Sequence, residues 1–207
     1  MTPAEFAAAV PVSRETLDRL TAYLDLLTQW NRRIKLVGPG SMRDPWCRHI
    51  LDSAQLLPLI PAGSRGLLDL GSGAGLPGLV LAILGARNVH LVEADQRKAA
   101  FLREAARITG AAVTIHACRI ESVGLLDIDV VTARALSSLT ELLSHASLYR
   151  RNDLVCLFLK GASLDEELTV ARQQWNIRFT KVPSRSSADG TILVVEGFEH
   201  GSDGRTR

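Results

Sequence analysis

The chain has 207 residues, of which 46% are hydrophobic and 22% are charged, and its formal net charge is +2. This composition is ordinary for a globular protein and excludes wholesale disorder, while the length suits one domain with an appendage. Apolar runs such as residues 79–84 are far shorter than the roughly 20 residues that a membrane helix needs, and the amino-terminus lacks a basic-then-apolar signal pattern. We therefore expect a cytoplasmic protein with no membrane partner.

Cysteine usage and local charge add two expectations. Cys47, Cys118 and Cys156 lie far apart, with no CxxC pair and no clustered histidine, so we expect free thiols and no metal site. Between residues 30 and 50, basic side chains outnumber the single acid, Asp44. This bias could form a surface that meets RNA phosphates, or it could be an ordinary solvated face. The cations are Arg32, Arg33, Lys35, Arg43 and Arg48.

The first sixty residues are predicted to be helical and free of strands. Ser13 can cap a long amphipathic helix that runs to about Lys35, because its leucines recur with i, i+3, i+4 spacing. Glycine and proline at 38–40 end it, and a second helix is expected over about 44–57. We assign residues 1–62 to an N-terminal helical cap.

From residue 66, short apolar runs alternate with amphipathic segments, which predicts a mostly parallel sheet with helices on both faces. The last two runs are joined by a loop too short for a crossover helix, so we expect them to pair antiparallel. We assign residues 63–199 to the core of the fold and 200–207 to a flexible tail. Strands are expected over 67–70, 89–93, 112–117, 128–133, 154–159, 177–182 and 191–198, and helices over 77–84, 96–108, 138–149 and 164–175.

The segment "LLDLGSGAGLPG" (67–78) places four glycines directly behind the first strand. Glycines at this point let the turn into the next helix approach an anionic ligand closely. Gly73, Gly75 and Gly78 fit the G-x-G-x-x-G dinucleotide pattern, whereas Gly71, Gly73 and Gly75 fit the G-x-G-x-G pattern of methyltransferases that bind S-adenosylmethionine.

The position of Gly71 directly at the strand end favours the second pattern. Glu93 closes the next strand, where a carboxylate can accept hydrogen bonds from the ribose hydroxyls that both cofactors carry. The chain has no second nucleotide-binding half, and its last strands form a hairpin, which also favours a methyltransferase. A small NAD(P)-dependent reductase remains an alternative, and so does an RNA-binding ribosome-assembly factor that retains a nucleotide site.

Several segments together resemble the glucose-inhibited division protein B family, from about residue 13 to 198. They are Trp30-Asn31, "RHILDS" (48–53), the glycine segment with its Leu-Pro-Gly ending, "LVEADQRKAAFLRE" (91–104), "RIESV" (119–123), "ARAL" (133–136) and "LKG" (159–161). The resemblance implies a Rossmann-like α/β methyltransferase fold whose seven-stranded sheet has an antiparallel last strand. It also implies transfer of a methyl group from S-adenosylmethionine to N7 of a guanine in the 530 loop of bacterial 16S rRNA.

The resemblance further implies which residues hold the cofactor. The methionine and ribose portions would lie against Gly71, Gly73 and Leu76, with Glu93 on the ribose. Arg134 would reach the cofactor near the reacting end, although it could instead pair with an acid such as Glu121. Ile120 and Glu121 would line the adenine.

Contacts with the target nucleotide are expected at Lys160, Arg48 and His49, while Asp52 is expected to hold the helical cap to the sheet.

No Asn/Asp-Pro-Pro-Tyr and no Pro-Cys follows the fourth strand, which argues against methylation of an exocyclic adenine amine and against a covalent route to cytosine C5. Guanine N7 has its own lone pair, so its methylation needs positioning more than a base, and we assign no catalytic residue. The expected partner is 16S rRNA, as RNA, in the 30S subunit or in an assembly intermediate, and we expect a monomer.

Overall fold

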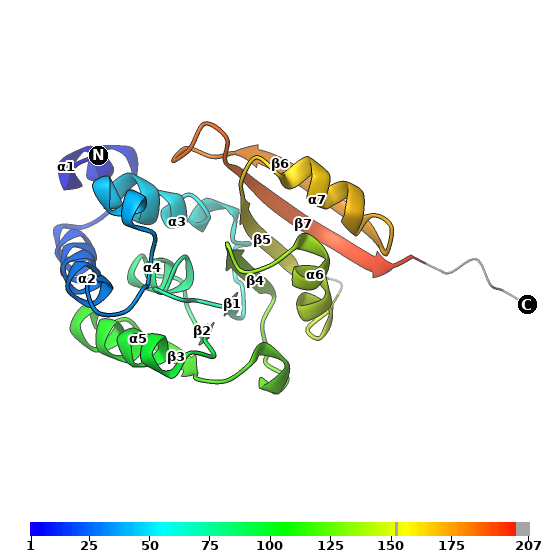
Figure 1. Ribbon diagram of the computed structural model, residues 1–207, viewed down its shortest axis with the longest axis horizontal. Helices are drawn as coiled ribbons and strands as arrows, with labels where there is room; N and C mark the ends of the chain where they lie inside the picture. Colours follow the sequence, from blue (N-terminus) through cyan, green and yellow to red (C-terminus); the bar gives the residue numbers. More distant parts are fainter. Residues whose placement is uncertain (152, 202–207) are drawn as a thin grey trace, which may run out of the picture.

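A seven-stranded sheet with helices on both faces organises the structure, a computed structural model that describes residues 1–151 and 153–201 (Figure 1). The strand order is β3-β2-β1-β4-β5-β7-β6, and every pair is parallel except those that β7 makes with β5 and β6. The mostly parallel sheet with an antiparallel last strand, expected from the sequence, is confirmed. The strands are β1 (Leu67–Leu70), β2 (Val89–Val92), β3 (Val113–His116), β4 (Val130–Arg134), β5 (Val155–Lys160), β6 (Trp175–Pro183) and β7 (Thr191–His200).

Helices cover the sheet on both faces. The α-helices are α1 (Pro3–Ala9), α2 (Arg14–Asn31), α3 (Asp52–Ala54), α4 (Gly78–Ile83), α5 (Gln96–Thr109), α6 (Leu139–Ser147) and α7 (Leu164–Ala171). Short 3-10 or π turns are η1 (Pro39–Arg43), η2 (Trp46–Leu51), η3 (Leu57–Leu59) and η4 (Ile120–Ser122). Within the described residues, no helix is long and apolar enough to cross a membrane.

Two hydrophobic clusters fill the space on either side of the sheet. One joins α4, α5 and the N-terminal helices to alternate strand residues such as Leu67 and Leu91. The other joins α6 and α7 to the intervening residues, such as Leu68 and Phe158. Because both faces are covered, the central strands are apolar at successive positions rather than at alternate ones.

The N-terminal helices differ in detail from the sequence prediction. Helix α1 was not predicted, although Thr2 and Glu5 form a capping box at its start. Helix α2 ends at Asn31 and not near Lys35, because the Asn31 side chain accepts hydrogen bonds from the amides of Leu36 and Val37 and turns the chain back.

The second predicted helix, 44–57, is a π turn followed by one short α-turn. At its end the hydrogen bonding changes to the 3-10 pattern, because the amide of Leu56 donates to the carbonyl of Ser53 three residues earlier. Pro58 then lies in a separate 3-10 turn. The helix predicted over 164–175 ends at Ala171, because Trp175 already belongs to β6 and packs in the core at 3% exposure. His200 is the last residue of β7, and residues 202–207 of the predicted tail lie outside the described residues.

Candidate functional site

A cavity of about 1090 Å³ opens at the carboxyl ends of the central parallel strands. It spans the point where the strand order changes direction, between β1 and β4, which is where open parallel sheets bind ligands. All the site residues proposed from the sequence line this cavity. They are Gly71, Gly73, Leu76, Glu93, Ile120, Glu121, Arg134, Lys160, Arg48 and His49.

The glycine loop between β1 and α4 presents bare backbone to the cavity at Gly71 and Gly73. Both have a left-handed backbone, with φ of 61° and 55°. A Cβ at Gly73 would meet nothing closer than the Gly71 carbonyl oxygen at 3.8 Å, so a side chain there would enter open space in the cavity. The loop can therefore cradle a ligand at Gly73.

The other two glycines serve packing. A Cβ at Gly75 would lie 2.7 Å from the Leu79 Cβ, and one at Gly78 would lie 2.6 Å from the Asp69 Cβ. Gly78 is also absent from the cavity wall. Gly71 lines the cavity, but a Cβ there would overlap the Leu136 side chain, so Gly73 is the glycine of this loop with open space in front of it.

Glu93 lies beside this loop at the end of β2, with 8% of its surface exposed. Its Oε2 accepts a hydrogen bond from the Gly73 amide at 2.9 Å, and its Oε1 accepts one from the Asp95 amide at 2.8 Å. Each carboxylate oxygen has a further lone pair, so the group can still accept hydrogen bonds from ligand hydroxyls.

Asp69, which the sequence interpretation did not propose as a site residue, holds the loop from below. It is fully buried in β1, and its carboxylate accepts hydrogen bonds from the Thr132 hydroxyl at 2.7 Å and the Gly78 amide at 3.2 Å. Burial raises the pKa of Asp69 to about 6, with these hydrogen bonds partly offsetting the effect. An acid within the apolar run "LLDL" is the signal that could have identified it.

Tyr23 on α2 also supports the loop and was not proposed from the sequence. Its buried hydroxyl donates to the Ala74 carbonyl at 2.7 Å. Because α2 belongs to the N-terminal helices and Ala74 to the glycine loop, this bond connects the helical region to the loop directly.

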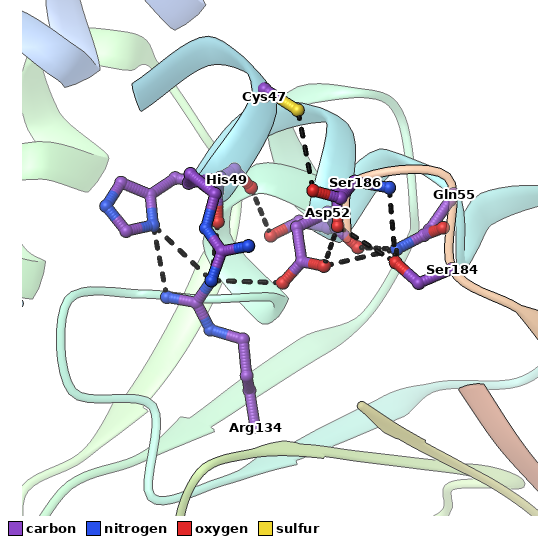
Figure 2. Close-up of polar contacts among 9 residues, drawn as sticks. Cys47, His49, Asp52, Gln55, Arg134, Ser184 and Ser186 are labelled. Atoms are coloured by element: carbon purple, nitrogen blue, oxygen red, sulfur yellow. Dashed lines mark hydrogen bonds and ion pairs between the residues drawn. The ribbon is translucent and has the colours of Figure 1, made fainter. Parts of the chain in front are cut away.

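Arg134, at the end of β4, is bound by the N-terminal region (Figure 2). Its Nη1 donates to Asp52 Oδ2 at 3.1 Å and to the Arg48 carbonyl at 3.0 Å. The alternative pairing with Glu121 is not what the structure shows. Asp52 in turn accepts hydrogen bonds from Gln55 and from the Ser186 hydroxyl in the β6–β7 loop. Asp52 therefore links the helical cap to the sheet, as expected, and adds a link to that loop.

His49 is 2% exposed and its Nδ1 faces the Arg134 guanidinium, with both Nη atoms at 3.4 Å (Figure 2). A guanidinium only donates, so Nδ1 is the acceptor and the proton of the neutral ring lies on Nε2. Burial, with the Arg134 charge, lowers the pKa of His49 to about 4. His49 Nε2 is buried without a hydrogen-bond partner among the described residues.

Lys160, at the end of β5, pairs with Glu167 on α7 at 2.7 Å. Lys160 also donates to the Ser137 carbonyl at 3.2 Å, and Glu167 accepts from the Leu139 amide at 2.9 Å. The side chains are 8% and 22% exposed, and both line the cavity. Glu167 was not proposed from the sequence, and its spacing seven residues after Lys160 offered no recognisable pattern.

On the opposite side of the cavity, η4 contributes Ile120 and Glu121, and Cys118 precedes it. Ile120 packs against the second hydrophobic cluster, while Glu121 is exposed. All three cysteines are free, as expected.

The basic segment after α2 lies at one edge of the cavity. All five of its cations are exposed, and Arg48 lines the cavity. Within the part of the chain that the structure describes, none of the five forms an ion pair, and Asp44 pairs with the amino-terminus instead. Elsewhere Arg65, Arg107, Arg151 and Lys181 all pair with carboxylates.

Comparison with known proteins finds the same family over nearly the whole chain. The family model for rRNA small subunit methyltransferase G matches residues 16–191. The chain is 56% identical over 195 residues to the ribosomal RNA small subunit methyltransferase G of Rhodospirillum rubrum, covering 94% of the chain and 97% of that protein. It is 52% identical over 201 residues to the protein of that name from Paramagnetospirillum magneticum, covering 97% and 98%.

Solved structures resemble the fold at low sequence identity. The ribosomal protein L11 methylase from Lactobacillus delbrueckii subsp. bulgaricus superposes with a TM-score of 0.58 at 16% identity, over 77% of this chain and 82% of that chain. At this identity the likeness concerns the fold alone.

Proposed function

The chain belongs to the rRNA small subunit methyltransferase G family, and we propose that it transfers the methyl group of S-adenosylmethionine to N7 of a guanine in the 530 loop of 16S rRNA. Membership of the family makes the chain an S-adenosylmethionine-dependent methyltransferase of small-subunit rRNA. The proposal adds the position of the modified guanine in the 530 loop. The observation that carries the proposal is the cavity at the β1–β4 switch point, with bare backbone at Gly73 and the Glu93 carboxylate beside it.

The residues present fit the cofactor. We propose that Gly71, Gly73 and Leu76 hold the methionine and ribose portions and that Glu93 accepts the ribose hydroxyls. Ile120 supplies an apolar surface for the adenine, and Glu121 lies next to it. Arg134 forms the wall near the reacting end, where Asp52 and His49 hold its guanidinium in place.

The chemistry requires little proton transfer. S-adenosylmethionine supplies a methyl group on a sulfonium, so that the carbon–sulfur bond breaks as the N7 lone pair forms the new bond and the positive charge passes to the purine. Because N7 carries no proton to remove, the side chains of the cavity orient the base and exclude water. This accounts for a site without an assigned catalytic base.

We propose that the rRNA approaches from the side of the basic segment. Exposed cations that form no ion pair with the described residues can neutralise phosphates, and counterion release then favours binding. Arg48 lies where this segment meets the cavity, and His49 and Lys160 lie deeper in it.

We further propose that the substrate is 16S rRNA, either alone or within the 30S subunit or its assembly intermediate, and that the enzyme acts as a cytoplasmic monomer with no membrane partner. The division into a cap (1–62) and a core that begins at residue 63 is part of this proposal, with the core extended by one residue to His200, the last residue of β7.

The test is methylation of naked 16S rRNA, 30S and 70S particles with labelled S-adenosylmethionine, followed by mapping of the product. We expect label at N7 of one guanine in the 530 loop in at least one of these substrates. Equal labelling of unrelated structured RNAs would contradict the assignment. Calorimetric titration with S-adenosylhomocysteine and with NADH distinguishes the reductase alternative, since only the first is expected to bind.

A further inference from the structure

The cavity is long enough to hold more than the cofactor, and its far end is built by Lys160 and Glu167. Its lining extends from Glu93 at the end of β2, past Arg134 at the end of β4, to Lys160 at the end of β5. The proposed cofactor site occupies the β1–β2 side. The space over β4 and β5 is therefore where the target base must lie, and this inference rests on the proposed function.

The Lys160–Glu167 pair has hydrogen-bonding capacity left over. Lys160 has three donors and uses two, on Glu167 and the Ser137 carbonyl. Glu167 Oε2 accepts from Lys160 and the Leu139 amide, whereas Oε1 accepts, among the described residues, only from the Ser163 hydroxyl at 3.3 Å. One donor and at least one acceptor position are thus available side by side.

Other carboxylates that line the cavity are less suited to read the base. Asp52 is engaged by Arg134 through one oxygen and by Gln55 and Ser186 through the other. Glu93 and Glu121 belong to the proposed cofactor side. Glu167 is therefore the acid on the β5 side with free acceptor capacity.

Guanine offers the complementary pattern. Its Watson–Crick edge carries two donors, N1–H and the N2 amino group, next to the O6 acceptor, and enzymes that modify a flipped base read this edge by hydrogen bonds. When N7 points toward the cofactor, the edge with N1 and N2 points away from it, toward the β5 wall. We propose that Glu167 accepts the N1–H and N2–H donors of the target guanine and that Lys160 donates to O6, so that this pair selects guanine. Adenine lacks the N1–H and the 2-amino group and cannot satisfy Glu167.

The experiment is a competition between two forms of the rRNA substrate assembled by ligation, one with guanosine and one with inosine at the mapped target. Inosine keeps N7, O6 and N1–H but lacks the 2-amino group. We expect the wild type to prefer guanosine by about 10- to 100-fold in kcat/KM, the loss associated with one hydrogen bond to a charged acceptor. In Glu167→Gln, the preference falls to about 3-fold or less on the same reasoning, while the affinity for S-adenosylhomocysteine stays unchanged.

The ratio of the two substrates in one reaction does not depend on how much of a variant is folded, so partial unfolding of Glu167→Gln leaves the test valid. Glu166→Gln, which removes the same charge from an exposed neighbour on α7, is the matched control and should keep the wild-type preference. If Glu167→Gln is too slow to measure, Glu167→Asp replaces it, and a reduced preference is again expected. The proposal is wrong if the wild type does not distinguish the two substrates or if the Glu167 variant keeps the preference. A wild type that methylates neither form, or guanine at another atom, overturns the proposed function as well, which separates the two failures.

Discussion

At the level of single residues, Gly73 offers the sharpest test of the cofactor site. Its φ of 55° and the open space beyond its Cα mean that Gly73→Val both strains the backbone and fills the cradle. We expect binding of S-adenosylhomocysteine to be lost in calorimetry. Gly110→Val is the matched control, because Gly110 has a φ of 62° and open space but caps α5 away from the cavity. Unchanged affinity in a folded Gly73→Val would refute the assignment.

The buried side chain of His49 makes the stability of the protein depend on pH. Its folded pKa of about 4 lies below the ordinary histidine value of 6.5, so as the pH falls from 6.5 toward 4 the unfolded chain binds a proton that the native state does not. The free energy of unfolding should therefore fall toward acid pH. Urea unfolding should show that wild type loses about 2 kcal/mol more than His49→Asn between pH 7 and pH 5. Equal losses would show that the native state tolerates a charged His49.

Among the elements, α2 and the glycine loop form the contact with the clearest consequence. Removing the Tyr23 hydroxyl in Tyr23→Phe leaves the Ala74 carbonyl without its donor. We expect the affinity for S-adenosylhomocysteine to fall by about 3- to 10-fold, on the order of one hydrogen bond. Tyr149→Phe is the control, because Tyr149 belongs to the second hydrophobic cluster, on the other face of the sheet, and its hydroxyl contacts the Gly124 carbonyl at 3.4 Å. If both variants lose only stability, the loop keeps its shape without α2.

At the level of the whole molecule, the distribution of paired and unpaired cations predicts how RNA binding depends on salt. Replacing Arg32, Arg33 and Arg43 by Gln should reduce the slope of log K against log salt by about 2 to 3, since each phosphate contact contributes about 0.7 to 0.9. Filter binding at several salt concentrations measures this slope. Replacing three cations that are paired with acids by Gln should leave the slope nearly unchanged. These control residues are Arg107, Arg151 and Lys181. Equal effects of both sets would mean that net charge alone governs binding.

The sequence by itself determined the strands and the position of the glycine turn after β1. Residues 67–70 were predicted with the observed bounds, because a strand buried on both faces is a short apolar run. Gly71, Gly73 and Glu93, which the sequence proposes as cofactor contacts, lie at strand ends that open onto the cavity. These signals are local in the chain, and parallel strands bring their carboxyl ends to one edge whatever else the protein does.

Only the tertiary structure decided which distant groups meet. Arg134 pairs with Asp52, Tyr23 reaches Ala74, and the β6–β7 loop contacts Asp52 through Ser186. The place where α2 ends was decided by the side chain of Asn31 and not by the apolar periodicity. No local pattern encodes these contacts, because they depend on how the helical region packs on the sheet, and many pairings of arginine with acid satisfy the same sequence.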